Sequence, residues 1–545
     1  TTTTRTATFV ANDGILDSNT ASRTITVTAV NDLPVNSVPV TQVTAKNTAK
    51  VFSAGFGNLI SISDLDAGSS SVRVQLVSTN GTTTIVGSGL TFSVGDGTAD
   101  ATMTFTGTVA NVNLALAGLS FNPNNNFIGA ASLQIVTNDL GNTGTGGAGS
   151  DTDSITITVA NAPVVTTTVA NLAYVENGTT AVDSLITVTD ADSATLVSAT
   201  VAMTTNYING QDTLLFVTQN GITGTWTPSS GILALSGSAT LANYQAALRS
   251  ITYNNNSDSP TTTNRAVTFK VNDGVLNSNT ASRTITVTAV NDVPVITPTS
   301  GSMAYTENGT SVVDSLITVT DADSANMSSA TVTITNKVAA QDTLAFINQN
   351  GITGTWTAST GILALSGSSS VANYQTALRS ITYNNSSDNP TTTTRTVTFV
   401  VNDGTANSNT ASRTITLTAV NDSPVNSVPG SQTTAKNTTK AIPISISDLD
   451  AGSSLVQVQL VATNGTVSLS DQSGLTFTVG DGDKDPTMTF TGTIATVNAR
   501  LAGLSFTPTT GFTGAASLRI VTSDLGNTGT GGTLVDTDTI AITVT

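Results

Sequence analysis

Apolar and polar residues alternate over short stretches of the chain, and clusters of Gly, Asn, Asp and Ser separate these stretches. In residues 283–290, Ile285 and Val287 alternate with threonines, which is the two-residue period of a strand with one buried face. Threonine suits the outward face of such a strand, because its branched side chain packs well on a pleated surface. The pattern therefore predicts many short strands joined by tight turns.

A few segments have helical spacing instead, with apolar residues three and four positions apart. These residues are Leu241, Tyr244 and Leu248 in one segment and Val109, Val112 and Leu116 in another. The spacing predicts one short helix in each repeating stretch of the chain.

Long stretches of the sequence recur, and this recurrence decides the architecture. Residues 161–290 and 291–420 share segments such as NGITGTWT, which places Trp226 and Trp356 at equivalent positions. We call these stretches type B repeats, B1 and B2. Residues 33–160 and 421–545 share SISDLDAGSS, LAGLSF and DLGNTGTGG. We call them type A repeats, A1 and A2.

The two types resemble each other, since residues 109–121 align with residues 241–253. Residues 1–32 match residues 391–422, so we expect them to be the C-terminal strands of a truncated type B domain, with an internal cut at Thr1. Repeats of ~130 residues with many short strands are typical of Ig-like or cadherin-like sandwiches. The expected fold is all-β, with tandem Ig-like or cadherin-like β-sandwich domains in a linear array and one short helix per domain.

Composition excludes several kinds of site. The 545 residues include no Cys and no His, which removes thiolate and imidazole nucleophiles and the usual zinc ligands. A formal net charge of -17 cannot neutralise phosphates, so we expect no nucleic-acid partner. No apolar run approaches the ~18 residues of a membrane helix, so this segment is expected not to insert into a membrane. Cations are the expected counterpart of the acidic charge.

The acidic residues recur in a fixed set of motifs. The two glutamates of the chain, Glu176 and Glu307, both stand in Glu-Asn-Gly-Thr near the start of a B repeat. Asp-Ala-Asp follows the next strand, Asn-Asp-Gly comes near the repeat's end, and the linker reads Val-Asn-Asp-x-Pro. In an Ig-like sandwich we expect these segments to meet at the N-terminal end of the domain. At the start of B2 the residues expected to gather are Asn291, Asp292, Glu307, Asp321, Asp323 and Asp403.

So many carboxylates in one volume repel each other unless a cation lies among them. Calcium fits best, because it accepts six to eight oxygen ligands in flexible geometry, whereas magnesium prefers tighter octahedra with retained water. Calcium is therefore the expected cofactor.

The motifs Val-Asn-Asp-x-Pro, Glu-Asn-Gly and Asp-Ala-Asp resemble the interdomain calcium motifs of cadherin repeats. The whole B repeat resembles the cadherin-like, Ig-like tandem repeats of giant bacterial extracellular adhesins, and the resemblance covers nearly the entire chain. It implies that Asn291 and Asp292 are linker ligands. It also implies that Glu307 is a ligand from the first segment and that Asp321 and Asp323 form a bridging pair.

The type A repeats depart from this pattern. Lys46 and Lys436 stand where the B repeats have glutamate, and the linker of residues 160–163 from A1 to B1 contains no Asp. We expect this junction to hold fewer ions or to bend more. The complete set of expected calcium ligands is Asn31, Asp32, Asp64, Asp66, Asp139, Asp151, Asp153, Asn161, Glu176, Asp190, Asp192, Asp273, Asn291, Asp292, Glu307, Asp321, Asp323, Asp403, Asn421, Asp422, Asp448, Asp450, Asp524, Asp536 and Asp538.

Other interpretations remain for some of these residues. A single Asp in a turn more often caps local amides than binds a metal. A solvated hairpin is the simpler interpretation of the VGDG loops, which contain Asp96, Asp100, Asp481, Asp483 and Asp485. Trp226 and Trp356 are more typical of core anchors than of sugar-stacking platforms. Paired carboxylates could in principle hydrolyse glycosides, but enzymes rarely repeat an active site at every linker, so we expect no enzyme.

The expected function is a calcium-rigidified stalk or filament segment, extracellular or at the cell surface, that serves adhesion or surface structure. One alternative is a self-assembling extracellular fibre or sheet, which the low charged fraction of 10% mildly favours. Another is an array of carbohydrate-binding modules, which should show an exposed aromatic platform. The expected partners are calcium ions, and either further copies of the chain or a cell-surface or glycan ligand bound through other regions.

Overall fold

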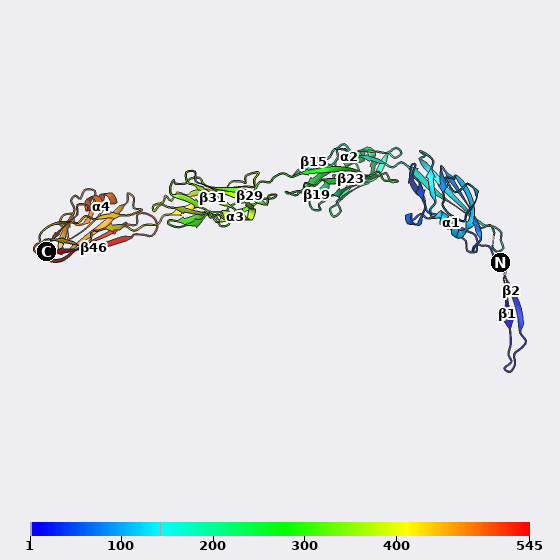
Figure 1. The fold of residues 1–545 in the computed structure, drawn as a ribbon, viewed down its shortest axis with the longest axis horizontal. Coiled ribbons are helices and arrows are strands. Elements are labelled where there is room, and N and C mark those ends of the chain that lie inside the picture. Colours follow the sequence, from blue (N-terminus) through cyan, green and yellow to red (C-terminus); the bar gives the residue numbers. More distant parts are fainter. Residues whose placement is uncertain (1–2, 142) are drawn as a thin grey trace. The chain divides into compact units, whose positions relative to one another are not determined.

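A computed structural model describes residues 3–141 and 143–545 of the chain. The chain separates into two compact units, Thr1–Val290 and Asn291–Thr545. The first contains an N-terminal hairpin, A1 and B1, and the second contains B2 and A2. Figure 1 labels many of these elements and draws the hairpin in dark blue and A2 in orange and red.

In the hairpin and A1, the elements are β1 (Thr3–Phe9), β2 (Ala21–Val27), β3 (Val35–Ser37), β4 (Gln42–Ala45), β5 (Lys50–Val51), the 3-10 helix η1 (Ala54–Phe56), β6 (Ser61–Ser63), β7 (Ser71–Thr79), β8 (Gly81–Thr84), β9 (Thr91–Val94), β10 (Thr102–Thr108), α1 (Val109–Leu116), β11 (Ser120–Pro123), β12 (Gly129–Asn138) and β13 (Ser150–Ala160). In B1 they are β14 (Val164–Thr166), β15 (Leu172–Val175), β16 (Thr180–Ala181), β17 (Thr187–Thr189), β18 (Thr195–Thr205), β19 (Asp212–Leu215), β20 (Thr223–Thr227), β21 (Ile232–Thr240), α2 (Leu241–Arg249), β22 (Thr252–Asn255), β23 (Arg265–Asn272) and β24 (Ala281–Thr288).

In B2 the elements are β25 (Val295–Thr297), β26 (Ser302–Thr306), β27 (Ser311–Val312), β28 (Thr318–Thr320), β29 (Asn326–Ile334), β30 (Asp342–Ala345), β31 (Thr353–Thr357), β32 (Ile362–Ser370), α3 (Val371–Arg379), β33 (Thr382–Asn385), β34 (Arg395–Asn402) and β35 (Ala411–Thr418). In A2 they are β36 (Val425–Ser427), β37 (Gln432–Thr434), β38 (Lys440–Ala441), β39 (Ser445–Ser447), β40 (Leu455–Thr463), β41 (Gly465–Ser468), β42 (Thr476–Val479), β43 (Thr487–Thr493), α4 (Ile494–Leu501), β44 (Ser505–Pro508), β45 (Gly514–Ser523) and β46 (Val535–Val544).

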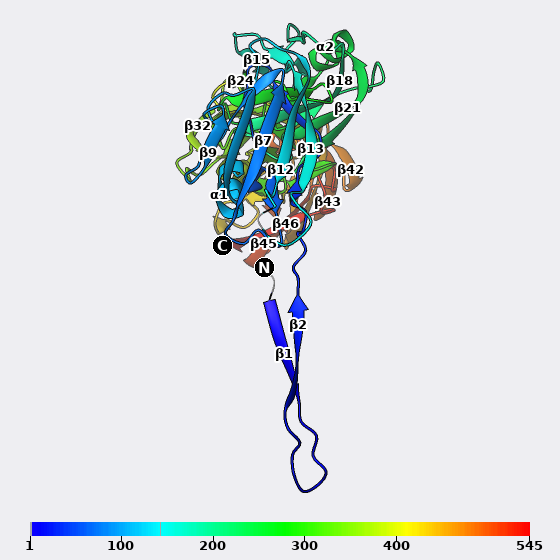
Figure 2. The ribbon, with the colours of Figure 1, turned by 90° about the vertical axis from the view of Figure 1, so that its right-hand side faces the viewer.

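All four repeats have the same sheets. In B2 the six-stranded sheet has the order β26-β35-β34-β29-β32-β31, the three-stranded sheet has the order β27-β33-β30, and β25 pairs with β28. A1, B1 and A2 repeat this order with their own strands. Figure 2 shows β7, β12 and β13 of A1 lying side by side, in agreement with their pairing. The predicted all-β fold of tandem sandwiches is confirmed.

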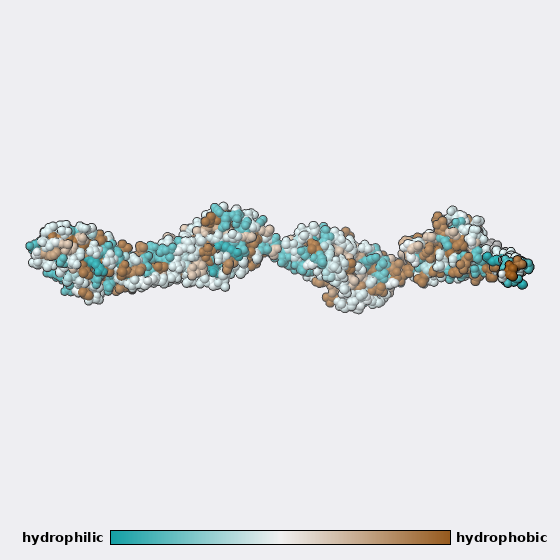
Figure 3. All heavy atoms as spheres, turned by 90° about the horizontal axis from the view of Figure 1, so that it is seen from below, coloured by the Kyte–Doolittle hydropathy of each residue, from teal (hydrophilic) through white to brown (hydrophobic). Residues whose placement is uncertain are grey.

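The alternation in the sequence predicts the buried faces correctly. Ile285 and Val287 of β24 are 0% and 3% exposed, while Thr288 beside them is exposed. Each repeat encloses its own hydrophobic core between its sheets. On the face drawn in Figure 3, apolar residues form small areas scattered among hydrophilic ones. The extent of each domain stays a prediction, and so does the assignment of residues 1–32 to a truncated B domain.

The short helices connect the six-stranded sheet to the three-stranded sheet. In B1, α2 follows β21 directly, and the side chain of Thr240 caps it by accepting a hydrogen bond from the Asn243 amide. The helix buries Tyr244, Ala247 and Leu248, close to the predicted face. Among the described helices, none is both long and apolar enough to cross a membrane.

The pairing of the first and last long strands fixes where each end of a repeat lies. In B2, β26 runs parallel to β35, and Thr306 pairs with Thr418 at the ends of the two strands. The residue after β26 therefore lies where β35 leaves the repeat. The chain enters B2 at the opposite end, because β25 pairs with β28 there, with Val295 opposite Thr320.

Candidate metal sites at the repeat junctions

Buried acidic side chains fall into two groups, and arginine balances the first. In the cores of the B repeats, Asp212 lies 3.4 Å from Arg265 and Asp342 lies 2.7 Å from Arg395, measured from carboxylate oxygen to guanidinium Nε. The Tyr253 and Tyr383 hydroxyls donate further hydrogen bonds to these two carboxylates. Because these charges are compensated inside the fold, they require no metal ion.

The second group lies where a repeat meets its linker. Among the described residues, no lysine or arginine nitrogen comes within 4.0 Å of the carboxylates of Glu307, Asp422 or Asp450. Glu307 is 5% exposed and Asp450 is 2% exposed. Acidic groups this deeply buried and lacking a cationic partner are candidates for binding a metal ion.

The structure corrects the predicted position of Glu307. We expected it at the N-terminal end of B2 with Asp321, Asp323 and Asp403, and this position is wrong. The Glu307 amide donates to the Thr418 carbonyl, and Glu307 Oε2 accepts a 2.8 Å hydrogen bond from the Val420 amide. The glutamate therefore lies where the chain leaves B2, at the opposite end of β35.

The same correction applies to Glu176 in B1. We expected this glutamate near Asp190, Asp192 and Asp273 at the start of the repeat. Instead its amide donates to the Thr288 carbonyl, and its Oε2 accepts a 2.8 Å hydrogen bond from the Val290 amide. The cause in both repeats is the parallel pairing of β15 with β24 and of β26 with β35, which carries the chain across the whole domain before the glutamate is reached.

At the exit of B2, three carboxylates from separate segments converge. Oxygen atoms of Glu307, Asp388 and Asp422 all lie within 4.8 Å of one another. Glu307 follows β26, Asp388 lies in the loop between β33 and β34, and Asp422 lies in the linker to A2. Glu307 is buried, Asp422 is half-buried and Asp388 is exposed. Such a set of oxygen ligands is typical of a site for a hard divalent cation.

A2 contributes its Asp-Leu-Asp motif to the same junction. The Asp422 amide donates a 3.1 Å hydrogen bond to Asp450 Oδ2, and Asp448 Oδ1 accepts from the amides of Asp450 and Ala451. A direct bond also joins the two repeats, because Asn389 Nδ2 of B2 donates to the Asp450 carbonyl at 2.8 Å. The linker and the start of A2 are thus held against the acidic end of B2.

Burial and mutual repulsion raise the pKa values of the carboxylates in this cluster. Burial raises the pKa of Glu307, and the nearby charges of Asp422, Asp388 and Asp450 raise it further. Burial, together with the charges of Asp450 and Asp388, also raises the pKa of Asp422. Burial and the neighbouring Asp450 carboxylate raise the pKa of Asp448 to about 6. A bound cation would remove this mutual repulsion.

Unpaired oxygens point to the same conclusion. Glu307 Oε1, Asp422 Oδ2, Asp448 Oδ2 and Asp450 Oδ1 are all buried and have no hydrogen-bond partner. Buried carboxylate oxygens are normally satisfied by a donor or a metal. The donor set at this junction therefore fits a metal ion that takes only oxygen ligands.

The N-terminal end of B2 holds the remaining residues predicted there. Asn291 Nδ2 donates to Asp403 Oδ2 at 2.8 Å, and the Asp323 amide donates to Asp321 Oδ1 at 3.1 Å. Asp321 Oδ2 and Asp323 Oδ1 are buried and have no partner. Burial raises the pKa of Asp321, and the neighbouring Asp323 carboxylate adds to the shift. Asp403 Oδ1 also closes its own turn by accepting from the amides of Thr405 and Ala406.

The start of A1 matches the start of A2. The Asp32 amide donates to Asp66 Oδ2 at 3.1 Å, and the Asp66 amide donates to Asp64 Oδ1 at 3.2 Å. Asp64 Oδ2 and Asp66 Oδ1 are buried and have no hydrogen-bond partner. Burial raises the pKa of Asp64, and the neighbouring Asp66 carboxylate adds to the shift.

The junction from A1 to B1 has a different composition. The Asn161 amide donates to Asp192 Oδ2 at 2.9 Å, and the Asp192 amide donates to Asp190 Oδ1 at 3.1 Å. B1 therefore presents the same Asp-x-Asp turn as the other repeats. On the A1 side, the Lys46 amide donates to the Ala160 carbonyl, so lysine occupies the place that Glu307 has at the exit of B2. Asp273 closes its turn through the amides of Val275 and Leu276.

Several aspartates of the A repeats have structural contacts. Asp524 Oδ1 accepts from the amides of Gly526 and Leu534, and Asp524 Oδ2 accepts from Asn421 Nδ2. Asp139 has the corresponding bonds in A1, to Gly141, Gly149 and Asn31. Asp151 Oδ2 and Asp536 Oδ2 accept from the amides of Asn36 and Asn426, which fixes β3 and β36. Asp153 and Asp538 lie in β13 and β46, half-buried. Their role as ligands stays a prediction.

Sequence reasoning missed Asp388 and its equivalent Asp258. Each belongs to a B repeat and lies between two strands near Pro390 or Pro260, in Ser-Asp-Asn-Pro or Ser-Asp-Ser-Pro. The A repeats have no aspartate at this place, just as they have no glutamate. This joint occurrence of the glutamate and the aspartate in one repeat type was the available signal.

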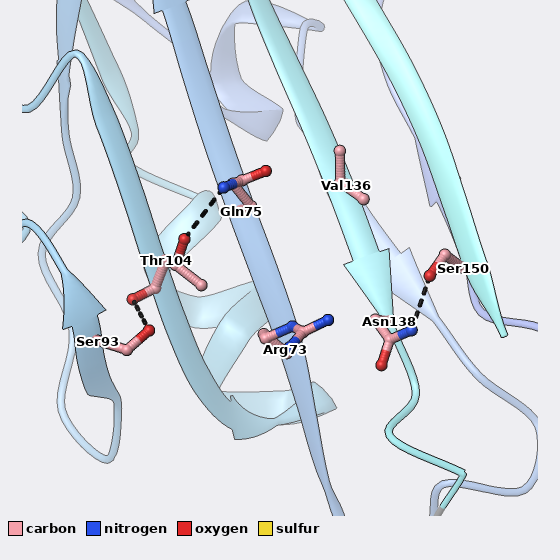
Figure 4. A pocket seen from close by; sticks show the side chains of 7 residues that line it. All are labelled: Arg73, Gln75, Ser93, Thr104, Val136, Asn138 and Ser150. Atoms are coloured by element: carbon pink, nitrogen blue, oxygen red, sulfur yellow. Dashed lines mark hydrogen bonds between the residues drawn. The ribbon is translucent and has the colours of Figure 1, made fainter. Parts of the chain in front are cut away.

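Other candidates from the sequence have structural roles. Asp100 Oδ2 accepts from the amides of Asp96 and Gly97, and Asp485 makes the same turn in A2. Trp226 and Trp356 pack against the cores of their repeats. A hollow of about 340 Å³ on the outer face of A1 is lined by polar residues such as Arg73 and Gln75 (Figure 4). Its lining includes neither a carboxylate nor an aromatic side chain, so it offers neither an acid pair nor a stacking platform.

No protein-family model matches the chain. Among curated proteins, Halomucin of Haloquadratum walsbyi is 37% identical to this chain over 119 residues. The matched stretch covers 20% of this chain and 1% of Halomucin. The chain therefore spans a very small part of that relative's length.

Solved structures similar to the chain include mouse cadherin-23 EC22-24, with 16% identity, coverage of 71% of this chain and 99% of that one, and a TM-score of 0.23. Human CDH23 EC21-23 has 11% identity, coverage of 71% and 100%, and a TM-score of 0.23. The four N-terminal Ig domains of Dscam1 isoform 7.44 have 10% identity, coverage of 95% and 100%, and a TM-score of 0.17. The sheets described above define the fold of this chain independently of these likenesses.

Proposed function

We propose that the chain is a segment of an extracellular stalk or filament, without enzymatic activity, whose repeat junctions are stiffened by calcium. The repeats themselves are rigid sandwiches with separate cores. The joints between them carry the acidic clusters. In this proposal, calcium converts flexible joints into fixed ones and so sets the mechanical state of the chain.

One observation carries the proposal, namely the buried and unpaired Oε1 of Glu307. The other oxygen of this carboxylate is bound to the linker amide of Val420. The free oxygen therefore belongs to a side chain fixed in place, with Asp388 and Asp422 beside it. A fixed, buried carboxylate next to two others is costly to leave uncompensated, and a divalent cation compensates all three.

The ligand chemistry favours calcium. The carboxylates of Glu307, Asp388, Asp422 and Asp450 come from both repeats and from the linker, and they include both buried and exposed groups. Calcium accepts such an irregular shell of six to eight oxygens, whereas magnesium requires a near-ideal octahedron and retains water. With neither Cys nor His in the sequence, the ligands suit a hard cation better than zinc or copper.

The proposed location follows from the expected affinity. Extracellular calcium modules bind with dissociation constants of about 10⁻⁴ to 10⁻³ M. Sites of this strength fill where calcium is abundant and remain empty where it is scarce. We therefore place the working form of the chain outside the cell or at its surface.

Thermal unfolding of the whole chain tests the proposal. A ligand that binds only the folded state stabilises it by ~2.7 kcal/mol per site at 100 times its dissociation constant, so calcium should raise the melting midpoint well above that in chelator. Sodium chloride at matched ionic strength and magnesium serve as controls for screening and for general divalent charge. Equal midpoints with calcium and with chelator would contradict calcium at the junctions.

A further inference from the structure

The loop between β45 and β46 of A2 has an unusual sequence, Asp-Leu-Gly-Asn-Thr-Gly-Thr-Gly-Gly-Thr at residues 524–533. Asp524 closes this loop, because its Oδ1 accepts hydrogen bonds from the amides of Gly526 and Leu534. The B repeats have a short Asn-Asp-Gly turn at this place instead. The extended glycine-rich loop is therefore a feature of the type A repeats.

This loop pairs with the linker that enters A2. Val420 and Thr530 form a parallel β-bridge, in which the Asn421 amide donates to the Thr530 carbonyl and the Thr530 amide donates to the Ala419 carbonyl, both at 2.9 Å. Asn421 is 5% exposed, and its Nδ2 donates to the Gly532 carbonyl at 3.0 Å and to Asp524. The linker is thus bound through its main chain as well as its side chain.

A1 holds its own incoming linker in the same way. Val30 and Thr145 form a parallel bridge, the Asn31 amide donates to the Thr145 carbonyl at 3.0 Å, and the Thr145 amide donates to the Ala29 carbonyl at 2.9 Å. The same contacts therefore occur in two separate copies of the repeat.

Glycine makes this close approach possible. Gly529 has φ +69°, and a Cβ atom added there would lie 2.5 Å from the Asn421 nitrogen and the Val420 carbonyl carbon. Gly144 of A1 has φ +75°, and a Cβ atom there would lie 2.6 Å from the corresponding linker atoms. A side chain at either position would push the linker out of the loop. The absence of a side chain at these two glycines thus leaves room in the loop for the linker backbone.

We propose that the glycine-rich loop of each A repeat is a latch, which captures the linker entering that repeat and holds the junction closed without a metal ion. The latch consists of uncharged hydrogen bonds and one Asn-to-Asp contact, so it does not depend on neutralising the acidic cluster. Junctions that lead into an A repeat are therefore held in two independent ways. Junctions that lead into a B repeat have no such loop in their sequence.

Hydrogen exchange of the whole chain in chelator tests the latch, because exchange reports opening of individual amide hydrogen bonds. The amides of Asn421 and Thr530 should exchange at least about tenfold more slowly than free amides even without calcium. Failure of the calcium proposal would leave this result unchanged, since no metal is present in the experiment. Exchange of the Asn421 amide at the free rate in the unmodified chain would overturn the latch.

A matched pair of variants sharpens the test. Gly529→Ala and Gly511→Ala both place a side chain at positive φ in A2, at +69° and +84°, but Gly511 lies outside the glycine-rich loop and a Cβ there meets nothing within 4 Å. Gly529→Ala should abolish the protection of Asn421, while Gly511→Ala should change it less than about threefold. Unchanged exchange in β40 and β45 shows that A2 remains folded. Equal effects of the two variants would refute capture of the linker.

A1 provides a second pair if either A2 variant fails to fold. Gly144→Ala carries the clash with the linker, and Gly147→Ala, at φ +80° with nothing within 4 Å, is its control. The readout is exchange of the Asn31 and Thr145 amides in chelator. Gly144→Ala should release both amides, and Gly147→Ala should release neither; any other result contradicts the latch.

Discussion

The junction from B2 to A2 and the junction from A1 to B1 are built from the same fold but differ in charge. In both junctions the repeat that follows the linker has an Asp-x-Asp turn, and the second aspartate of this turn accepts a hydrogen bond from a linker amide. The repeats that precede the linkers differ, because B2 contributes Glu307 and Asp388, whereas A1 contributes Lys46 and no aspartate. The linker of the first junction contains Asp422, and that of the second contains Ala162.

This difference lies in the repeat that precedes each junction, so under the calcium proposal we infer that this repeat sets how strongly the junction holds cations. The start of every repeat is acidic, so the start alone does not distinguish the junctions. The exit of a B repeat adds negative charge, and the exit of an A repeat adds positive charge. Four predictions test this comparison.

Glu307→Lys should have the largest effect on calcium binding. It places at the C-terminal end of B2 the lysine that the A repeats have at this position. Replacing a ligand by an ammonium group next to a divalent ion should weaken calcium binding at this junction on the order of 100-fold, which is ~2.7 kcal/mol. Calorimetric titration of the whole chain measures the number and affinity of the sites. Asp96→Lys makes the same change of charge in an exposed turn and should leave the titration unchanged. An unaltered titration for Glu307→Lys would remove the glutamate from the site.

The reverse exchange should have a smaller effect. Lys46→Glu combined with Ala162→Asp gives the A1 exit and its linker the acidic residues of the B2 junction. We expect calcium affinity at the A1 to B1 junction to rise by about tenfold, less than the opposite loss, because this junction still lacks the equivalent of Asp388. The same titration checks it, with Lys270→Glu at an exposed position of β23 as the charge control. If neither the number of bound calcium ions nor their affinity increases, the preceding repeat does not determine how much calcium the junction binds.

Acidification should stabilise the metal-free chain, mainly at the B2 to A2 junction. The pKa of Asp448 is raised to about 6 by burial and by Asp450, so the folded state binds a proton that the unfolded state releases. Stability in chelator should therefore rise as the pH falls from 7.5 to 5.5, by a few degrees in melting midpoint. With calcium bound the sign should reverse, because protons compete with the ion. A melting midpoint in chelator that decreases as the pH is lowered from 7.5 to 5.5 would contradict the raised pKa.

Asn389→Ser should have the smallest effect. B1 has Ser259 at this position, and the change removes the hydrogen bond from Asn389 to the Asp450 carbonyl. One such bond contributes ~0.5–1.5 kcal/mol, so we expect calcium binding at the junction to weaken by about threefold. Thr392→Ala at an exposed position of the same loop serves as the control, and an identical shift for both variants would argue against a specific contact.

The fold could be predicted from the sequence because its signals are local. Alternation in residues 283–290 gives the buried face of β24, and the spacing of Tyr244 and Leu248 gives α2. The Asp-x-Asp turns were also placed at the correct end, because the short strand before each of them pairs antiparallel with the first strand of its repeat and ends beside the linker.

The position of Glu307 could not be read from proximity in sequence. It lies 15 residues beyond Asp292, and an extended chain of that length reaches ~50 Å, which is enough to cross a whole sandwich. The glutamate could lie at either the N-terminal or the C-terminal end of B2. Which end it occupies depends on the pairing of β26 with β35, which is a tertiary contact. The latch escaped prediction for a related reason, because glycines in a loop do not reveal which backbone they admit.

The parallel alignment of the first and last long strands bears on how the sandwiches respond to tension. When a chain is pulled at both ends, β26 and β35 are drawn in opposite directions along their common axis, so their hydrogen bonds are loaded together in shear. Bonds loaded in shear break as a group, whereas bonds in a peeled hairpin break one after another. The same arrangement recurs in β4 with β13, β15 with β24 and β37 with β46. Each repeat therefore resists stretching through a row of hydrogen bonds that is loaded in shear, and under tension the joints should yield before the domains do.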